Sequence, residues 1–107
     1  MAKKKASARN LKREADRNTV KLRRDVERVE RASAGGSEDR PIEIVSASLV
    51  DVLAVADPCP LCGGELRLES HDAETLGEKR LRVARVVCKM CRSPWERFYR
   101  IVANVLN

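Results

Sequence analysis

Apolar residues in the first third of the chain recur with the period of an α-helix. On a helical wheel, at about 100° per residue, they form one narrow stripe: Leu11, Ala15, Leu22, Val26 and Val29. The other side of the wheel carries basic positions: Arg9, Lys12, Arg13, Arg17, Lys21, Arg23, Arg24, Arg28 and Arg31. This pattern predicts a two-faced helix that begins near Ser7, a suitable N-cap, and ends before Gly35. Because the stripe is narrow, three states stay open: a solvated helix, a partly disordered basic tail, and a helix ordered by a partner.

Small, glycine and acidic residues follow the predicted helix. The segment 32–41, ASAGGSEDRP, closes with a proline. This composition is typical of a linker. We therefore expect a basic amphipathic helix or tail over residues 1–31, a flexible acidic linker over 32–41, and a second domain over 42–107.

The second domain has the period-two alternation of β-strands. Residues 42–58 are rich in β-branched side chains and predict one or two strands, although residues 49–53 also fit a short helix. Three later segments alternate in the same way: 65–70, 80–88 and 95–105. Gly77 marks a turn in the polar segment between the first two of these. The pattern predicts an antiparallel hairpin with a third strand beside it.

Length and charge change this picture in two ways. A chain of 107 residues cannot rely on apolar burial alone, so we expect a further stabilising device. The net charge of +6 is unevenly distributed. Residues 1–31 carry 12 basic and 5 acidic groups, whereas residues 32–58 carry 1 basic and 5 acidic groups. Positive charge concentrated in one segment favours polyanions such as nucleic acid, although it also occurs on merely solvated helices.

The N-terminal segment gives no sign of export or membrane insertion. No apolar h-region follows the basic start, and no run approaches about 18 apolar residues. We therefore expect a cytoplasmic protein that does not bind membranes. In a reducing compartment, paired cysteines are metal ligands more often than disulfides.

The four cysteines form two C-x2-C pairs, Cys59 with Cys62 and Cys88 with Cys91, separated by 25 residues. Two such pairs supply the four tetrahedral thiolates of a structural zinc site. Gly63, directly after the first pair, permits the turn that points backbone N–H groups at sulfur. We predict one structural Zn²⁺ per chain, with rubredoxin-like iron and redox or disulfide chemistry as the alternatives.

The stretch CPLCGG around the first pair resembles the knuckle of zinc ribbon proteins, and the resemblance covers roughly residues 57–102. It implies a small metal-stabilised β fold: a three-stranded antiparallel sheet, with or without one extra preceding strand, whose zinc ligands are the same four cysteines. Arg92 departs from the family, which usually has glycine after its second pair. Zinc ribbons bind nucleic acid, bind proteins or stabilise enzymes, so the resemblance does not choose a function.

Chemistry beyond the metal is not indicated. Four thiolates saturate zinc and leave no position for water or substrate. The single histidine, His71, falls in the expected polar turn, where we expect an ordinary surface residue. We therefore predict a non-enzymatic protein without a small-molecule substrate.

The preferred function is binding of RNA or DNA. On the helix, the predicted contacts are Arg9, Lys12, Arg13, Arg17, Lys21, Arg24 and Arg28. On the last strand, the predicted contacts are Trp95, Arg97, Tyr99 and Arg100, which mix stacking rings with phosphate-binding cations. A competing expectation buries Trp95 or Phe98 in a core short of aromatics. The alternative function is a protein-interaction adaptor that docks through the apolar stripe, with the ribbon purely structural, and a thiol redox switch is a third.

Overall fold

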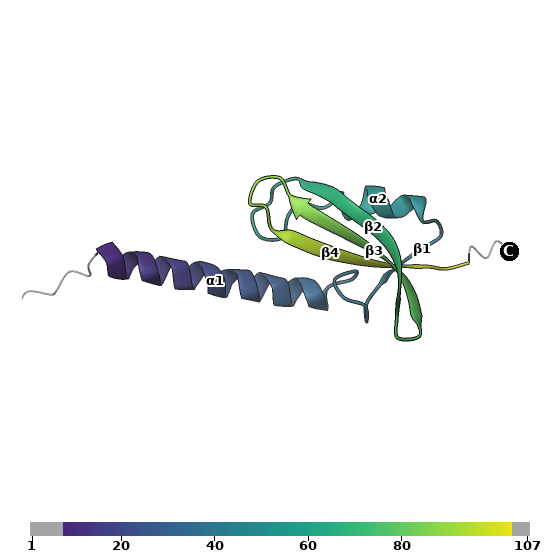
Figure 1. The fold of residues 1–107 in the computed structure, drawn as a ribbon, viewed down its shortest axis with the longest axis horizontal. Coiled ribbons are helices and arrows are strands. Elements are labelled where there is room, and N and C mark those ends of the chain that lie inside the picture. Colours follow the sequence, from purple (N-terminus) through teal and green to yellow (C-terminus); the bar gives the residue numbers. More distant parts are fainter. Residues whose placement is uncertain (1–7, 104–107) are drawn as a thin grey trace, which may run out of the picture.

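The computed structural model describes residues 8–103. The elements in chain order are α1 (Ala8–Ala32), β1 (Ile42–Ile44), α2 (Ser48–Ala54), β2 (Leu66–Leu76), β3 (Lys79–Cys88) and β4 (Pro94–Ile101). The long helix α1 projects from a small sheet (Figure 1). Its projection explains the radius of gyration of 19.0 Å, whereas a compact chain of this length has about 13 Å.

The sheet has four strands in the order β1-β4-β3-β2. β2, β3 and β4 form the antiparallel unit that the alternation predicted. β1 is the extra preceding strand, and it pairs parallel to β4, with Ile42 opposite Tyr99. The expectation of a purely antiparallel sheet is therefore wrong in detail. Between β1 and β4 the chain passes through α2, β2 and β3, and β4 then runs in the same direction as β1.

The β2–β3 hairpin is longer than predicted. Residues 71–76, HDAETL, were expected in a loop but continue β2 and pair with β3 as far as Lys79. Their side chains are exposed or half-buried on both faces, so no apolar alternation marks them as a strand. Gly77, with a φ of +64°, forms the tight turn.

The core lies between one face of the sheet and α2. Val86 and Trp95, which are cross-strand neighbours, belong to a buried cluster that also includes Val50 and Ala54 of α2. Those two residues are four apart and share one face of the helix. The second half of segment 42–58 is thus the short helix rather than a second strand.

The segment after α1 folds against the edge of β4. The Gly35 carbonyl accepts a hydrogen bond of 2.8 Å from the Phe98 N–H, and the Gly35 N–H bonds to the Arg40 carbonyl at 2.6 Å. Gly35 is buried, with a φ of +79°, which glycine adopts without strain. The residues expected to be a linker therefore carry specific contacts to the sheet.

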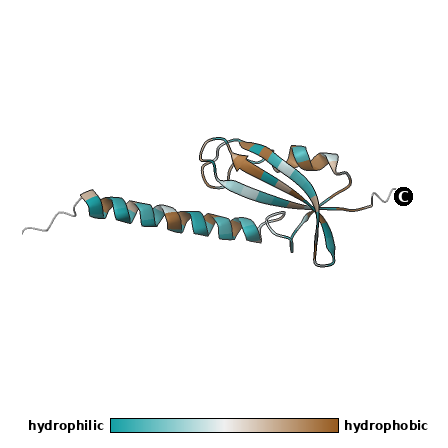
Figure 2. Cartoon of the chain, viewed as in Figure 1, coloured by the Kyte–Doolittle hydropathy of each residue, from teal (hydrophilic) through white to brown (hydrophobic). Residues whose placement is uncertain are grey.

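The two halves of α1 have different surroundings. Residues 8–22 are all exposed, whereas Val26 packs against the core cluster and Glu30 forms an ion pair with Arg97 of β4. Figure 2 shows mostly polar residues along α1, interrupted by a few apolar positions. No helix within residues 8–103 is long and apolar enough to cross a membrane.

Candidate metal centre

The four cysteines come from two turns that the sheet brings together. Cys59 and Cys62 lie in the turn before β2, Cys88 ends β3, and Cys91 lies in the turn that leads to β4. Their four sulfur atoms all lie within 4.8 Å of one another. The hairpin places both turns at the same end of the sheet, because Leu66 is paired with Cys88.

The two turns have equivalent backbones. The Gly63 N–H bonds to the Cys59 carbonyl at 2.8 Å, and the Arg92 N–H bonds to the Cys88 carbonyl at 3.0 Å. Gly63 has a φ of +77° and Arg92 a φ of +62°. Arg92 is the one non-glycine residue with a positive φ in residues 8–103. The second turn therefore keeps the left-handed conformation even without a glycine, at a cost of about 1–2 kcal/mol.

Backbone amides point at the sulfurs. The Gly64 N–H lies 3.3 Å from the Cys62 Sγ, and the Met90 and Cys91 N–H groups lie 3.3 and 3.4 Å from the Cys88 Sγ. Such contacts stabilise thiolates. The second amide pair also lowers the pKa of Cys88 below its usual value, with the Cys91 N–H as the largest cause.

The sulfur spacing fits a tetrahedral ion. The Cys59 and Cys91 Sγ atoms are 3.7 Å apart, and the Cys62 and Cys88 Sγ atoms are 3.3 Å apart. Four thiolates around zinc, at about 2.3 Å each, are separated by about 3.8 Å. A disulfide needs about 2.05 Å, and all four cysteines are free. The four cysteines are thus positioned to bind a metal ion.

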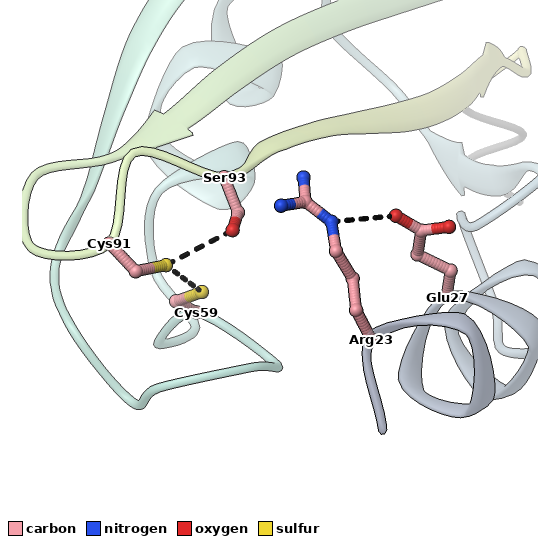
Figure 3. A network of polar contacts seen from close by, with 5 residues as sticks. All are labelled: Arg23, Glu27, Cys59, Cys91 and Ser93. Atoms are coloured by element: carbon pink, nitrogen blue, oxygen red, sulfur yellow. Dashed lines mark hydrogen bonds and ion pairs between the residues drawn. The ribbon is translucent and has the colours of Figure 1, made fainter. Parts of the chain in front are cut away.

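Ser93 is a part of this centre that sequence reasoning missed. Its hydroxyl lies 3.2 Å from the Cys91 Sγ (Figure 3), and only 2% of Ser93 is exposed. Hydrogen bonding with the Ser93 side chain, and then with the Ser93 backbone, lowers the pKa of Cys91 to about 6. The position of a serine two residues after a ligand was a local signal that could have revealed it.

Cys62 behaves in the opposite way. The Gly64 N–H works against protonation, but the neighbouring thiols of Cys88 and Cys91, with burial, raise the pKa of Cys62 to about 12. Four sulfurs this close cannot all carry charge near neutral pH without a cation between them. A divalent ion bound by Cys59, Cys62, Cys88 and Cys91 would supply that charge and displace the remaining protons.

Comparisons with known proteins give no match. No family model, no curated protein and no solved structure is similar to this chain. The metal centre is therefore supported by its own geometry. That geometry, with the four-stranded mixed sheet around it, fits a small metal-stabilised β fold.

The predicted stacking residues on β4 face inward. Trp95 is 7% exposed and Tyr99 is 1% exposed, and both belong to the core cluster. Arg97, on the same face, pairs with Glu30, while Arg100 pairs with Glu43. The expectation that Trp95 and Tyr99 stack on bases does not fit this burial, and it is not retained. The competing expectation, that the core takes an aromatic ring from this strand, is confirmed for Trp95.

The predicted basic contacts on α1 remain exposed. Six cations lie within about 80° of one another on the helical wheel. These are Arg13, Arg17, Lys21, Arg24, Arg28 and Arg31, and all of them are exposed. This arc faces away from Val26, the contact with the sheet. Arg28 forms an exposed ion pair with Asp25 at 3.0 Å, and breaking such a pair to bind a phosphate costs little free energy.

His71 does not lie in a turn, as the sequence suggested, but within β2. Its Nδ1 is 2.9 Å from an Asp51 carboxylate oxygen of α2, and 15% of its side chain is exposed. The extension of β2 beyond its apolar part carries His71 under α2. It is therefore a contact between α2 and the sheet rather than an ordinary surface residue.

Proposed function

We propose that this protein is a non-enzymatic, zinc-clamped module that binds the phosphate backbone of nucleic acid through the basic face of α1. Four thiolates complete the coordination of zinc, so the ion would hold Cys59, Cys62, Cys88 and Cys91 together without an open position for substrate. The zinc ion would therefore stabilise the fold. The binding surface is a separate part of the molecule.

The observation that carries the proposal is the arc of six exposed cations defined above. From Arg13 to Arg31 the helix rises by about 27 Å. This length spans many phosphates of a duplex, which carries one charge per about 1.7 Å of its axis. An α-helix also fits the width of a DNA major groove. Because the side chains of residues 8–22 are all exposed, this part of the helix can approach a groove without uncovering a core.

The sheet supports this helix from one end. Val26, Glu30 and Gly35 hold it to β4 and the core, and the sheet in turn is closed by the cysteines. In this arrangement the metal centre sets the position of the helix, and the helix makes the contacts with phosphate.

Salt dependence tests the proposal. We expect binding of a 20-nucleotide duplex or single strand, measured by fluorescence anisotropy, to weaken steeply between low and high salt. Replacing Arg17, Lys21 and Arg24 with glutamine removes three phosphate contacts, so the slope of log affinity against log salt should fall by about 2 to 3.

A matched control removes the same charge from the hairpin, by glutamine at Lys79, Arg80 and Arg82. This variant should keep the slope of the native chain. Equal slopes in the two triple variants, or no binding at low salt, would show that α1 is not the nucleic-acid surface.

A second candidate is docking of a protein on the apolar stripe. Leu11, Leu22 and Val29 are 55%, 57% and 62% exposed, unusual for the apolar side of a helix. A partner that is lost with Leu11→Asp plus Leu22→Asp, and kept with the three glutamines on the basic face, would favour this function.

A further inference from the structure

The side chain of one arginine of α1, Arg23, extends from the helix toward the turn that carries Cys91 and Ser93 (Figure 3), and 43% of it is exposed. Figure 3 shows the Arg23 guanidinium between Glu27 and the group formed by Cys59, Cys91 and Ser93. Its Nε lies 3.2 Å from the Glu27 carboxylate. Its terminal nitrogens have no hydrogen-bond partner in residues 8–103.

We propose that Arg23 is a positioning residue of the metal centre: it balances the negative charge of the metal–thiolate cluster and thereby fixes the middle of α1 on the sheet. The inference rests on the metal part of the proposed function. It does not depend on binding of nucleic acid.

The charge of the centre supplies the force. Four thiolates around a divalent ion leave a net charge of −2. Of the two basic residues nearest in sequence, Lys89 pairs with Glu65 at 3.2 Å and Arg92 is exposed. Arg23 is the cation that α1 brings to this side of the cluster. Glu27, one turn later, holds its Nε, and the guanidinium lies on the side of Ser93 and Cys91 (Figure 3).

The consequence reaches the basic face of the helix. Val26, one turn after Arg23, packs on the core cluster that includes Cys59. Glu30 and Gly35 attach the end of the helix independently. The pair Arg23 and Val26 is therefore the contact that fixes the direction in which residues 8–22 project. A loaded metal centre holds that direction, and a weakened one releases it.

Adjacent arginines provide a matched experiment. Arg23→Gln and Arg24→Gln remove the same charge one residue apart, but Arg24 lies on the exposed arc of cations. Arg23→Lys keeps the charge. Zinc affinity is measured by competition with a chelating indicator at low salt, and Co²⁺ substitution reports thiolate ligation through its charge-transfer absorption.

We expect Arg23→Gln to weaken zinc binding about tenfold, as loss of outer-shell partners does, while Arg24→Gln changes it less than twofold. Arg23→Lys should recover most of the loss, and added salt should reduce the difference between the two glutamine variants. The Co²⁺ absorption should be the same in all variants, because Arg23 is not a ligand.

Hydrogen exchange in the zinc-loaded state tests the helix separately. Peptides covering residues 21–28 should exchange faster in Arg23→Gln than in Arg24→Gln, with no difference over β3. Equal zinc affinities of the two glutamine variants, or equal exchange over 21–28, would overturn the proposal. Absence of the Co²⁺ charge-transfer band in the native chain would instead overturn the metal centre itself.

Discussion

The projecting half of α1 and the cysteine-closed sheet are held by different kinds of interaction. Residues 8–22 are helical although the side chains of all of them are exposed. The sheet buries Val50, Val83, Tyr99 and Cys88 almost completely, through residues far apart in sequence. The helix therefore carries exposed charge without depending on a core, whereas the sheet depends on long-range contacts that a single change can disrupt. We therefore expect the sheet to unfold without complete loss of the helix.

Metal removal should separate them most strongly. Structural zinc contributes roughly 10 kcal/mol or more to the folding of small domains. Chelation, or Cys88→Ser, should therefore unfold the sheet and expose Trp95, the single tryptophan, which is 7% exposed. The emission of Trp95 should shift to the red. Unchanged emission in protein shown to be free of metal would mean that the core is stable without the clamp.

The helix provides the control for this experiment. A helical signal in circular dichroism should partly persist after chelation, because the side chains of residues 8–22 are all exposed and do not depend on the buried core. Complete loss of helicity would contradict the division between the two regions.

The turn that joins the two regions should be the next most sensitive point. In Gly35→Ala, the new Cβ would lie 2.7 Å from the Ile42 Cδ1 and 2.9 Å from its Cγ1, at a φ of +79°. Strain and overlap together should cost about 2–3 kcal/mol. Gly77→Ala has a similar φ of +64° but open space around it, so it should cost about 1–2 kcal/mol.

Urea unfolding followed through Trp95 measures both variants. A larger loss at Gly77 than at Gly35 would show that the turn after α1 is not packed against β1 and β4 as the structure has it.

Local features of both regions could be predicted from the sequence. The period of α1, the two cysteine pairs and the alternation on β4 each depend on residues close together in the chain. The alternation of a strand implies that Trp95 and Tyr99 share one face, as they do in the structure. It could not say which face is buried, because this depends on where α1 and α2 pack.

The features that sequence analysis missed are pairings over long distances. The parallel strand β1 depends on three residues meeting the end of β4, and Glu30 meets Arg97 across 67 positions. Nothing local marks either pairing. Residues 32–41 have the composition of a linker. The hydrogen bond from the Phe98 N–H, which β1 does not pair, to the Gly35 carbonyl holds this segment against the sheet.

Loss of the ion pair between the regions should have a smaller effect than loss of the turn. Arg97 and Glu30 have side chains 11% and 23% exposed, whereas Arg100 and Glu43 are 52% and 56% exposed. Arg97→Met should leave Glu30 partly buried without a partner and cost about 1–2 kcal/mol. Arg100→Met should cost less than about 1 kcal/mol.

Thermal or urea unfolding compares these two variants directly. Equal costs would mean that Glu30 and Arg97 are as solvated in solution as the Arg100 pair, and that α1 is not held at that point.

The smallest expected effect is a change in the protons released on metal binding. Because the pKa of Cys91 is lowered to about 6, its thiolate and the Ser93 contact are present above that pH and are lost as pH falls through it. At pH 7.5 metal binding should therefore displace no proton from Cys91. Below pH 6 Cys91 is protonated, so the total number of protons released should be larger by one than at pH 7.5. Ser93→Ala raises the pKa of Cys91, so about one further proton should be released at pH 7.5.

Calorimetric titration with zinc, in two buffers of different ionisation enthalpy, counts these protons. Thr19→Ala, which deletes a hydroxyl bonded to the Ala15 carbonyl on the projecting helix, is the matched control and should leave the count unchanged. An unchanged count in Ser93→Ala would mean that the amides around Cys88, rather than Ser93, set the charge of the metal-free centre. A changed count in Thr19→Ala would instead mean that the helix affects protonation of the cysteines. We do not expect this, because residues 8–22 are all exposed.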